Sequence, residues 1–234
     1  MIPLNPKAPF RARLVAALAI CASLAFVATA SAVVYIYKNK FGSSAAFREI
    51  DQTGGGKVAC DETYSDGSKS MRIEMSGKTF CEFSPPVTGD GDQPDHEIVA
   101  SGRILDATPK KVREQAYLGV RVRVGDNTFY ELRVNPKEKE YKLNRTPSGG
   151  AAGLPVSGGS TSINPLGEKN TLRLRITGND VTAFVNGDSI ATYNDPNPGQ
   201  VTGRRVSFGI GSTKDAENGP IGVYKSIKVG VPSP

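Results

Sequence analysis

The sequence predicts an all-β protein, an antiparallel sandwich preceded by one N-terminal transmembrane helix. Two observations lead to this expectation. Residues 14–37 contain no charged side chain, whereas the chain after them repeatedly alternates apolar with polar residues. Alternation with a period of two is typical of a half-buried strand, and short runs separated by Gly, Asn and Asp turn signals are typical of sandwiches. Outside the uncharged run, the sequence shows no convincing helical stripe.

The uncharged run is long enough to cross a bilayer. A helix rises about 1.5 Å per residue, so residues 14–37 reach roughly 36 Å, compared with a hydrocarbon core of about 30 Å. The basic residues closest to the run are Lys7, Arg11, Arg13, Lys38 and Lys40. Three of these precede the run and two follow it, so residues 1–13 are expected to be a short cytoplasmic tail and the following domain extracytoplasmic.

Signal-peptide cleavage is the alternative to an anchor, because residues 28–30 and 30–32 both fit the small-x-small cleavage pattern. A removable apolar region is usually about 7 to 15 residues long. This run continues past both sites and ends near two tyrosines, which suit a membrane interface. We therefore expect an uncleaved single-pass signal anchor, a linker over residues 38–57 and a folded domain over residues 58–234.

The distribution of charge argues against a nucleic-acid partner. Of the 29 Lys and Arg residues, five lie in residues 1–40, which contain no Asp or Glu. The rest of the chain carries 24 basic and 23 acidic residues, a net charge of +1. The overall charge of +6 is thus mostly a topology signal rather than a nucleic-acid footprint.

Cys60 and Cys81 are the only cysteines that follow the apolar run. An even number of cysteines in an exported domain predicts a disulfide, which would stabilise the fold by roughly 3 kcal/mol in the chain-entropy model. Two buried reduced thiols are the alternative. We expect no metal site and no cofactor, because the only histidine, His96, is not spaced with either cysteine as a metal site requires.

The strand pattern is clearest in residues 117–124 and 171–176, where in each case two arginines alternate with aliphatic residues. Similar short runs lie at residues 71–75, 79–83, 97–105, 128–134, 181–185, 206–210 and 221–229. The glycine-rich residues 147–162 offer little apolar surface to bury, so they are expected to form a mobile loop between strands. Such a loop is either a tolerated insertion or a lid over a ligand.

An acidic stretch at residues 85–95 contains Asp90, Asp92 and Asp95, whose oxygens could bind calcium. An EF-hand loop starting at Asp90 would need glycine at its sixth position and an acidic residue at its twelfth. Asp95 and Ser101 occupy these positions, so the EF-hand pattern fails and only a looser calcium site stays open.

The last sixty or so residues resemble a known superfamily. The segments that carry the resemblance are NTLRLRITGNDVTAFVNG at 170–187, SFGIG at 207–211 and GVYKSIKV at 222–229. They are similar to the closing hairpins of concanavalin A-like (laminin-G-like) jelly rolls, including the sugar-processing domains related to family-16 glycoside hydrolases and keto-disaccharide hydrolases. This resemblance implies an antiparallel jelly-roll sandwich and a role with saccharides.

The catalytic pattern of the family-16 enzymes is missing from this chain. Their E-x-D-x-x-E strand, which points carboxylates at the sugar, does not occur. A glycosidase-like centre would have to use Asp95, Glu97 and Glu131. A serine hydrolase would need Gly-x-Ser-x-Gly, which is also absent, and His96 is the only histidine that could act as its base. The sequence therefore favours binding over catalysis.

Arginines supply the main candidate for a binding surface. If the aliphatic residues of strands 117–124 and 171–176 face the core, their arginines project from the opposite faces. In one common sheet they would form a basic patch that binds carboxylates or phosphates. The predicted patch consists of Arg121, Arg123, Arg133, Arg173 and Arg175. The alternative is a solvated sheet face balanced by Glu131 and other acids.

The sequence thus predicts a membrane-anchored, extracytoplasmic module that recognises envelope or extracellular glycans, with an anionic glycan or envelope polymer as its partner. Because the chain has no tryptophan, stacking on sugars would require exposed tyrosines such as Tyr64, Tyr141 or Tyr193, for which core or edge packing is the alternative. Two other functions stay open. A glycosidase-like enzyme would show a groove with convergent carboxylates, and a structural or partner-presenting ectodomain would show a flat, charge-mixed surface.

Overall fold

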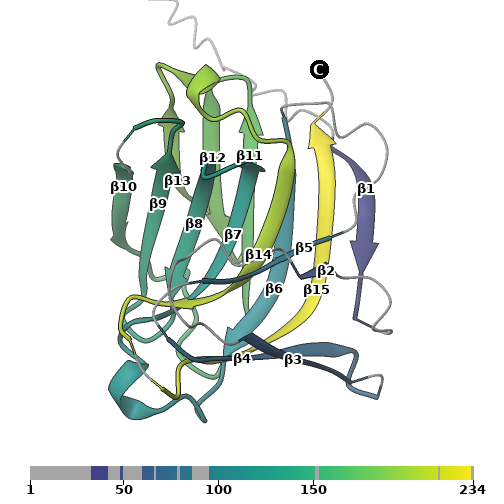
Figure 1. The fold of residues 1–234 in the computed structure, drawn as a ribbon, viewed down its shortest axis with the longest axis vertical. Helices are drawn as coiled ribbons and strands as arrows, with labels where there is room; N and C mark the ends of the chain where they lie inside the picture. Colours follow the sequence, from purple (N-terminus) through teal and green to yellow (C-terminus); the bar gives the residue numbers. More distant parts are fainter. Residues whose placement is uncertain are drawn as a thin grey trace, which may run out of the picture. The chain divides into compact units, whose positions relative to one another are not determined.

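The structure is a computed structural model of the 234-residue chain. It describes residues 33–41, 48–49, 60–65, 67–77, 80–85, 95–150, 153–215 and 217–232. Residues 31–234 make one compact unit, and its described part is a sandwich of two antiparallel sheets (Figure 1).

Sheet A has eight strands: β1 (Val33–Asn39), β3 (Cys60–Ser65), β4 (Ser70–Met75), β6 (Glu97–Ile104), β11 (Asn170–Thr177), β12 (Asp180–Val185), β13 (Asp188–Asn194) and β15 (Ile221–Pro232). Their order is β13-β12-β11-β6-β15-β4-β3, and β1 pairs with β15. Thus the first and last described strands are neighbours in one sheet.

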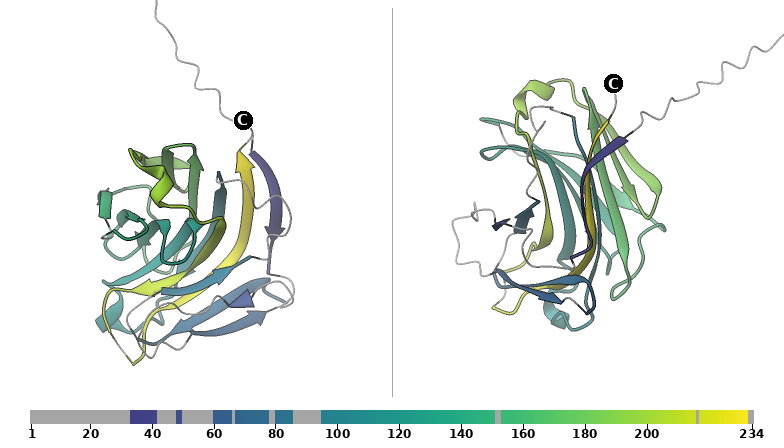
Figure 2. Two further views of the ribbon diagram at one scale, coloured as in Figure 1. Left: turned by 45° about the horizontal axis from the view of Figure 1, so that its top comes forward. Right: turned by 90° about the vertical axis from the view of Figure 1, so that its right-hand side faces the viewer.

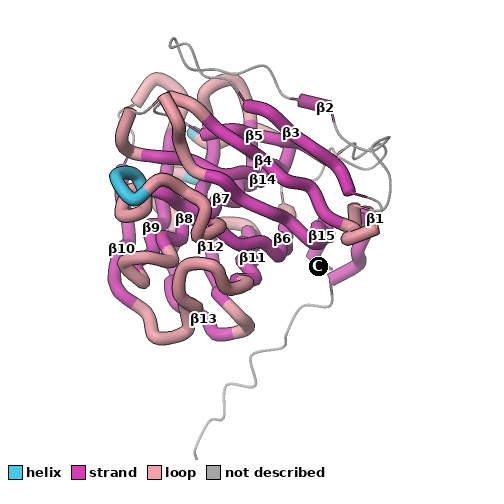
Figure 3. The backbone as a smooth tube through the Cα atoms, turned by 90° about the horizontal axis from the view of Figure 1, so that it is seen from below, coloured by secondary structure: helices cyan, strands magenta, loops and turns pink. Residues whose placement is uncertain are grey.

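Sheet B has seven strands: β2 (Arg48–Glu49), β5 (Phe80–Ser84), β7 (Ala116–Val124), β8 (Phe129–Asn135), β9 (Glu140–Thr146), β10 (Gly153–Gly159) and β14 (Arg205–Ser212). Their order is β10-β9-β8-β7-β14-β5-β2. Figure 2 shows the two sheets face to face. The helical turns in the described part are the short η2 (Lys110–Val112) and η3 (Pro198–Gln200), and strands dominate the tube in Figure 3.

The core lies between the sheets and is built from alternate residues of each strand. In sheet B, Phe83, Phe208, Val120 and Leu132 face one another in register across four strands, and each is almost completely buried. From sheet A, the Tyr224 ring meets Phe208 edge-on, with the ring centroids 4.9 Å apart. For β7, the period of two therefore identified the buried face correctly, because Val120 and Val122 are fully buried.

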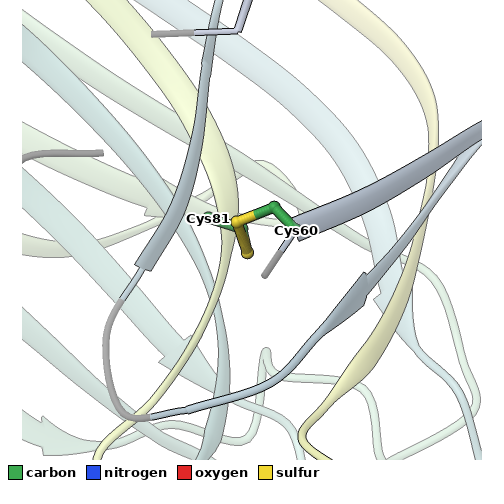
Figure 4. Close-up of a disulfide and its surroundings, with 2 residues drawn as sticks. All are labelled: Cys60 and Cys81. Carbon is green, nitrogen blue, oxygen red and sulfur yellow. A yellow bond between two sulfur atoms is a disulfide. The ribbon is translucent and has the colours of Figure 1, made fainter. Parts of the chain in front are cut away.

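The predicted disulfide is confirmed. Cys60 and Cys81 are joined by an S–S bond of 2.09 Å, with 5.8 Å between their Cα atoms (Figure 4). Cys60 begins β3 in sheet A, whereas Cys81 lies in β5 in sheet B. The bridge thus links the two layers of the sandwich.

The folded domain begins earlier than expected. Residues 33–37, predicted as the end of the transmembrane segment, instead form the start of β1 and pair with β15. Their valine, isoleucine and tyrosine side chains favour a strand as much as a membrane. The predicted tail 1–13 and residues 14–32 lie outside the described residues. Among the described residues, no helix has the length and apolar character needed to span a membrane.

The expected linker over residues 38–57 is also partly folded. Lys38 and Asn39 complete β1, and residues 48–49 form β2. The Asn39 side chain accepts a hydrogen bond from the Phe41 backbone N–H, and the Phe41 side chain is fully buried. A large apolar side chain in the core makes residues 38–41 part of the sandwich rather than a spacer.

The glycine-rich stretch 147–162 contains strand β10 instead of forming only a loop. β10 pairs with β9, with Val156 opposite Leu143 and Ser157 opposite Lys142. Ladder hydrogen bonds come from the backbone, so small side chains do not prevent pairing, and Val156 packs against the core. Strands β3, β9 and β13 were not predicted from the sequence, because they are partly exposed and their apolar residues alternate only weakly.

Candidate functional site

The predicted arginine patch does not form, because its members belong to different sheets. Arg121 and Arg133 lie on β7 and β8 of sheet B, whereas Arg173 and Arg175 lie on β11 of sheet A. The outer faces of the two sheets point in opposite directions. Arg123 is separate from both groups, because it donates to Asp95 (3.1 Å) and to the Gly178 carbonyl (3.0 Å) at one end of the sandwich.

The arginines of sheet A are held by a buried acid. Glu97 accepts hydrogen bonds from Arg175 Nε at 2.7 Å and from the Tyr35 hydroxyl at 2.9 Å. Arg173 Nε lies 4.0 Å from the same carboxylate, and its guanidinium stacks 3.5 Å from the centroid of the Phe184 ring. On this face of sheet A an acid balances the arginines, as the alternative to a basic patch predicts.

The outer face of sheet B carries a more concentrated group around Arg121. The Arg121 guanidinium donates to Glu82 at 2.8 Å and to Glu131 at 3.0 Å. Its central carbon also lies 4.3 Å from the centroid of the Phe80 ring and 4.0 Å from that of Phe129. Arg121 is only 8% exposed, so this ion-pair network is shielded from solvent. We call these five residues the Arg121 network.

Glu131 connects the network to its neighbours. Its second carboxylate oxygen accepts hydrogen bonds from Arg133 Nε at 2.6 Å and from Asn144 Nδ2 at 3.1 Å. Burial alone would raise the pKa of Glu131, but Arg121 and Arg133 outweigh it and hold that pKa below its usual range. Glu131 is therefore a carboxylate at neutral pH, fixed as a hydrogen-bond acceptor.

A hollow of about 80 Å³ opens beside the network on the same face. Its lining consists of Glu114, Gln115, Tyr117, Arg133, Asn135, Glu140, Lys142 and Thr213. The Arg133 guanidinium lies 4.7 Å from the centroid of the Tyr117 ring, and that ring stacks in parallel on Phe80 at 6.0 Å. The hollow thus combines cationic, carboxylate, amide and hydroxyl groups beside the Tyr117 ring.

Glycines in the neighbouring strands allow these rings to lie flat on the sheet. A Cβ at Gly119 would come within 2.5 Å of the Phe80 ring, and one at Gly211 within 2.2 Å of the Tyr117 ring. Any larger residue at either position would lift its ring away from the sheet. These two glycines therefore shape the floor of the hollow.

The three carboxylates proposed for a glycosidase-like centre do not converge. Asp95 pairs with Arg123 at the end of the sandwich, Glu97 lies on the outer face of sheet A, and Glu131 lies on the outer face of sheet B. The acid that shares Arg121 with Glu131 is Glu82, which sequence reasoning missed. The alternation in residues 80–84 could have identified it, because Cys81 and Phe83 face the core on either side of it.

The tyrosines considered for sugar stacking and the histidine considered as a base pack against or within the core. Tyr64, Tyr141 and Tyr193 pack as partly buried side chains against the core, and His96 is buried. In the part of the chain that the structure describes, no group of three His, Cys, Asp or Glu residues could hold a metal ion. Asp90 and Asp92, considered for calcium, lie outside that part.

Comparison with known proteins identifies the fold. No protein family model and no curated protein matches this sequence. Among solved structures, the chain is similar to a galectin-like protein of unknown function from Bacillus subtilis, with a TM-score of 0.58 and 12% identity over 85% of this chain and 97% of the other. This chain folds as a concanavalin A-like jelly roll.

Two further similar structures share this jelly roll. One is the Bacillus licheniformis beta-glucanase, with a TM-score of 0.54 and 11% identity over 82% of this chain and 96% of the enzyme. Another is the carbohydrate-binding module CBM66 from Bacillus subtilis, with a TM-score of 0.51 and 14% identity over 74% of this chain and 94% of the module. At these identities, the likeness concerns the fold.

Proposed function

We propose that this jelly roll is a glycan-binding module and that the hollow beside the Arg121 network is its binding site. The observation that carries the proposal is that Arg133, which lies over the Tyr117 ring, lines one hollow together with Lys142 and Asn135. Few, fixed polar groups around an apolar floor are typical of ligand sites. The names of two similar structures, a carbohydrate-binding module and a beta-glucanase, point to the same class of ligand.

The Arg121 network supports binding rather than hydrolysis. A glycosidase needs one carboxyl group that keeps its proton at working pH, which requires a raised pKa. The pKa of Glu131 is instead lowered, and both of its oxygens already accept hydrogen bonds from Arg121, Arg133 or Asn144. The network therefore acts as a rigid support that orients Arg133 toward the hollow.

The lining of the hollow contains two acids, Glu114 and Glu140, as well as Arg133 and Lys142, and these two cations would pair with the carboxylates of an acidic saccharide, such as a uronate polymer. Arg133 uses Nε to bind Glu131, and its guanidinium retains further N–H donors that can pair with a carboxylate. Lys142 is an exposed second cation. Another hollow, lined by Asp61, Glu74 and Glu217 near the β3–β4 edge, has no basic residue in its lining and would repel such a ligand.

Calorimetric titration of residues 33–234 with polygalacturonate oligosaccharides tests the proposal, with neutral β-glucan oligosaccharides as the comparison. Arg133→Ala combined with Lys142→Ala should weaken uronate binding by roughly 2 to 4 kcal/mol, and added salt should weaken it further. The matched control, Arg173→Ala combined with Lys228→Ala, makes the same charge change on sheet A and should leave the affinity unchanged. Equal loss in both double variants, or binding only to the neutral glucan, would contradict this site.

We also propose that residues 14–32 anchor the domain at the cell membrane with the jelly roll outside. As a helix, this uncharged stretch reaches about 28 Å, close to the hydrocarbon thickness of about 30 Å. The full chain should stay with membranes after alkaline carbonate extraction, and protease added to intact cells should remove the domain. A soluble mature protein that begins at Ser31 or Val33 would show cleavage instead.

A further inference from the structure

Strand β1 exposes apolar side chains along an edge of sheet A. Val34 is 61% exposed and Ile36 is 41% exposed, and every other large hydrophobic side chain in the described residues is more deeply buried. Edge strands of soluble sheets are usually protected by charge, proline or a covering segment. Val34 and Ile36 therefore give this edge an apolar surface that is open to contact.

The same edge carries two cations and an aromatic ring. Lys38 of β1 lies opposite Lys228 of β15, and both side chains are exposed. Their ammonium groups lie 5.4 Å and 5.5 Å from the centroid of the Tyr35 ring. The acid that contacts Tyr35 is Glu97, which is fully buried and paired with Arg175, so it does not offset the two lysines at the surface.

The chain reaches this edge directly from the uncharged stretch 14–32. Val33 already pairs with Pro232, so no spacer separates the stretch from the sheet. An extended chain advances about 3.4 Å per residue, so Val34 lies within roughly 7 Å of Ala32 along the chain. If residues 14–32 cross the membrane, the β1 edge must lie at the bilayer surface.

We propose that the β1 edge, formed by Val34, Tyr35, Ile36, Lys38 and Lys228, docks on the anionic lipid surface of the membrane that holds the chain. Val34 and Ile36 enter the interface, while the two lysines contact lipid phosphates. This inference rests on the anchoring proposed above. In Figure 1, β1 lies at the opposite margin of the domain from β9 and β10, so docking leaves the face with the hollow open to solvent.

The absence of tryptophan from the chain permits a direct test. Ile36→Trp introduces the only indole, and Lys137→Trp places one on the exposed turn between β8 and β9 as the matched control. The full-length variants are reconstituted in phosphatidylcholine–phosphatidylglycerol vesicles that contain brominated lipid. The indole at residue 36 should emit at shorter wavelength and be quenched by the brominated lipid, whereas the control indole should do neither.

A second experiment tests whether docking depends on the two lysines and on the charge of the lipid. Lys38→Gln with Lys228→Gln, in the Ile36→Trp background, should lower the ratio of docked to undocked protein by roughly tenfold or more. Replacing the anionic lipid with phosphatidylcholine should have a similar effect. An unquenched indole at residue 36 in protein that resists carbonate extraction would overturn docking while leaving the anchor intact. A short-wavelength emission without bromine quenching would instead indicate a second copy on this edge and would also overturn the proposal. Failure of the carbonate test itself would remove the anchor and, with it, this inference.

Discussion

Replacing Arg121 with methionine should destabilise the jelly roll far more than replacing an exposed arginine of the same sheet. Arg121→Met keeps most of the apolar stem but leaves two acids without their shared partner. Glu131 has a side-chain exposure of 0% and Glu82 of 10%, so solvent screens neither charge effectively. Breaking a buried ion pair by removing one partner costs about 3 to 5 kcal/mol. Loss of the contacts with the Phe80 and Phe129 rings adds to this cost.

Urea unfolding of residues 33–234, followed by circular dichroism, measures this effect. Arg205→Met is the matched control, because Arg205 lies at the exposed start of β14 in the same sheet and its replacement should change stability by less than about 0.5 kcal/mol. Adding Glu82→Gln to Arg121→Met should recover part of the loss by removing one unpaired charge. Equal urea midpoints for Arg121→Met and Arg205→Met would refute the view that this network supports the sheet.

The remaining predictions concern pH, the disulfide and a glycine. Because the pKa of Glu131 is lower in the folded state than in the unfolded chain, its ion pairs stabilise the fold above the unfolded pKa of about 4.3, and this stability is lost as pH falls through the folded pKa. Glu131→Gln should therefore flatten the acid limb of stability measured by urea unfolding between neutral and acidic pH; an unchanged acid limb would contradict this. Mass analysis without reductant should find the chain two hydrogen atoms lighter than its reduced form, and Cys60→Ala with Cys81→Ala should cost about 2 to 4 kcal/mol. Full alkylation of both cysteines in the unreduced protein would exclude the bridge. Gly119→Ala should cost about 1 to 3 kcal/mol because its Cβ meets the Phe80 ring, while Gly67→Ala, with open space around it, is the control; similar thermal midpoints for the two variants would count against the flat ring.

Local pattern was enough to predict most of the strands and the disulfide. Alternation along residues 117–124 and 171–176 reports which side chains face the core, because successive side chains point to opposite faces of any strand. The resemblance of residues 170–187 to a jelly-roll hairpin agreed with the observed β11–β12 pairing. Two cysteines in an otherwise cysteine-free domain left one pairing, and the structure contains it.

Three features depended on partners distant in the sequence. Arg121 and Arg173 occupy equivalent positions in similar local patterns, yet β7 joins sheet B and β11 joins sheet A. The apolar residues 33–37 suit a membrane and a strand equally well, and pairing with β15, almost two hundred residues later, places them in the sheet. Glu82 and Glu131 meet at Arg121 only because β14 lies between β5 and β7.

The sequence by itself determined the period of the strands, their buried faces, the cysteine pair and the uncharged stretch before the domain, because each is a property of neighbouring residues or of composition. Tertiary structure alone decided which strands share a sheet, where the domain begins and which acids surround each arginine. Strand order depends on backbone hydrogen bonds that any sequence can form, so side-chain pattern leaves it open. The candidate site, which is the Arg121 network with its neighbouring hollow, forms because this strand order brings its residues together in sheet B.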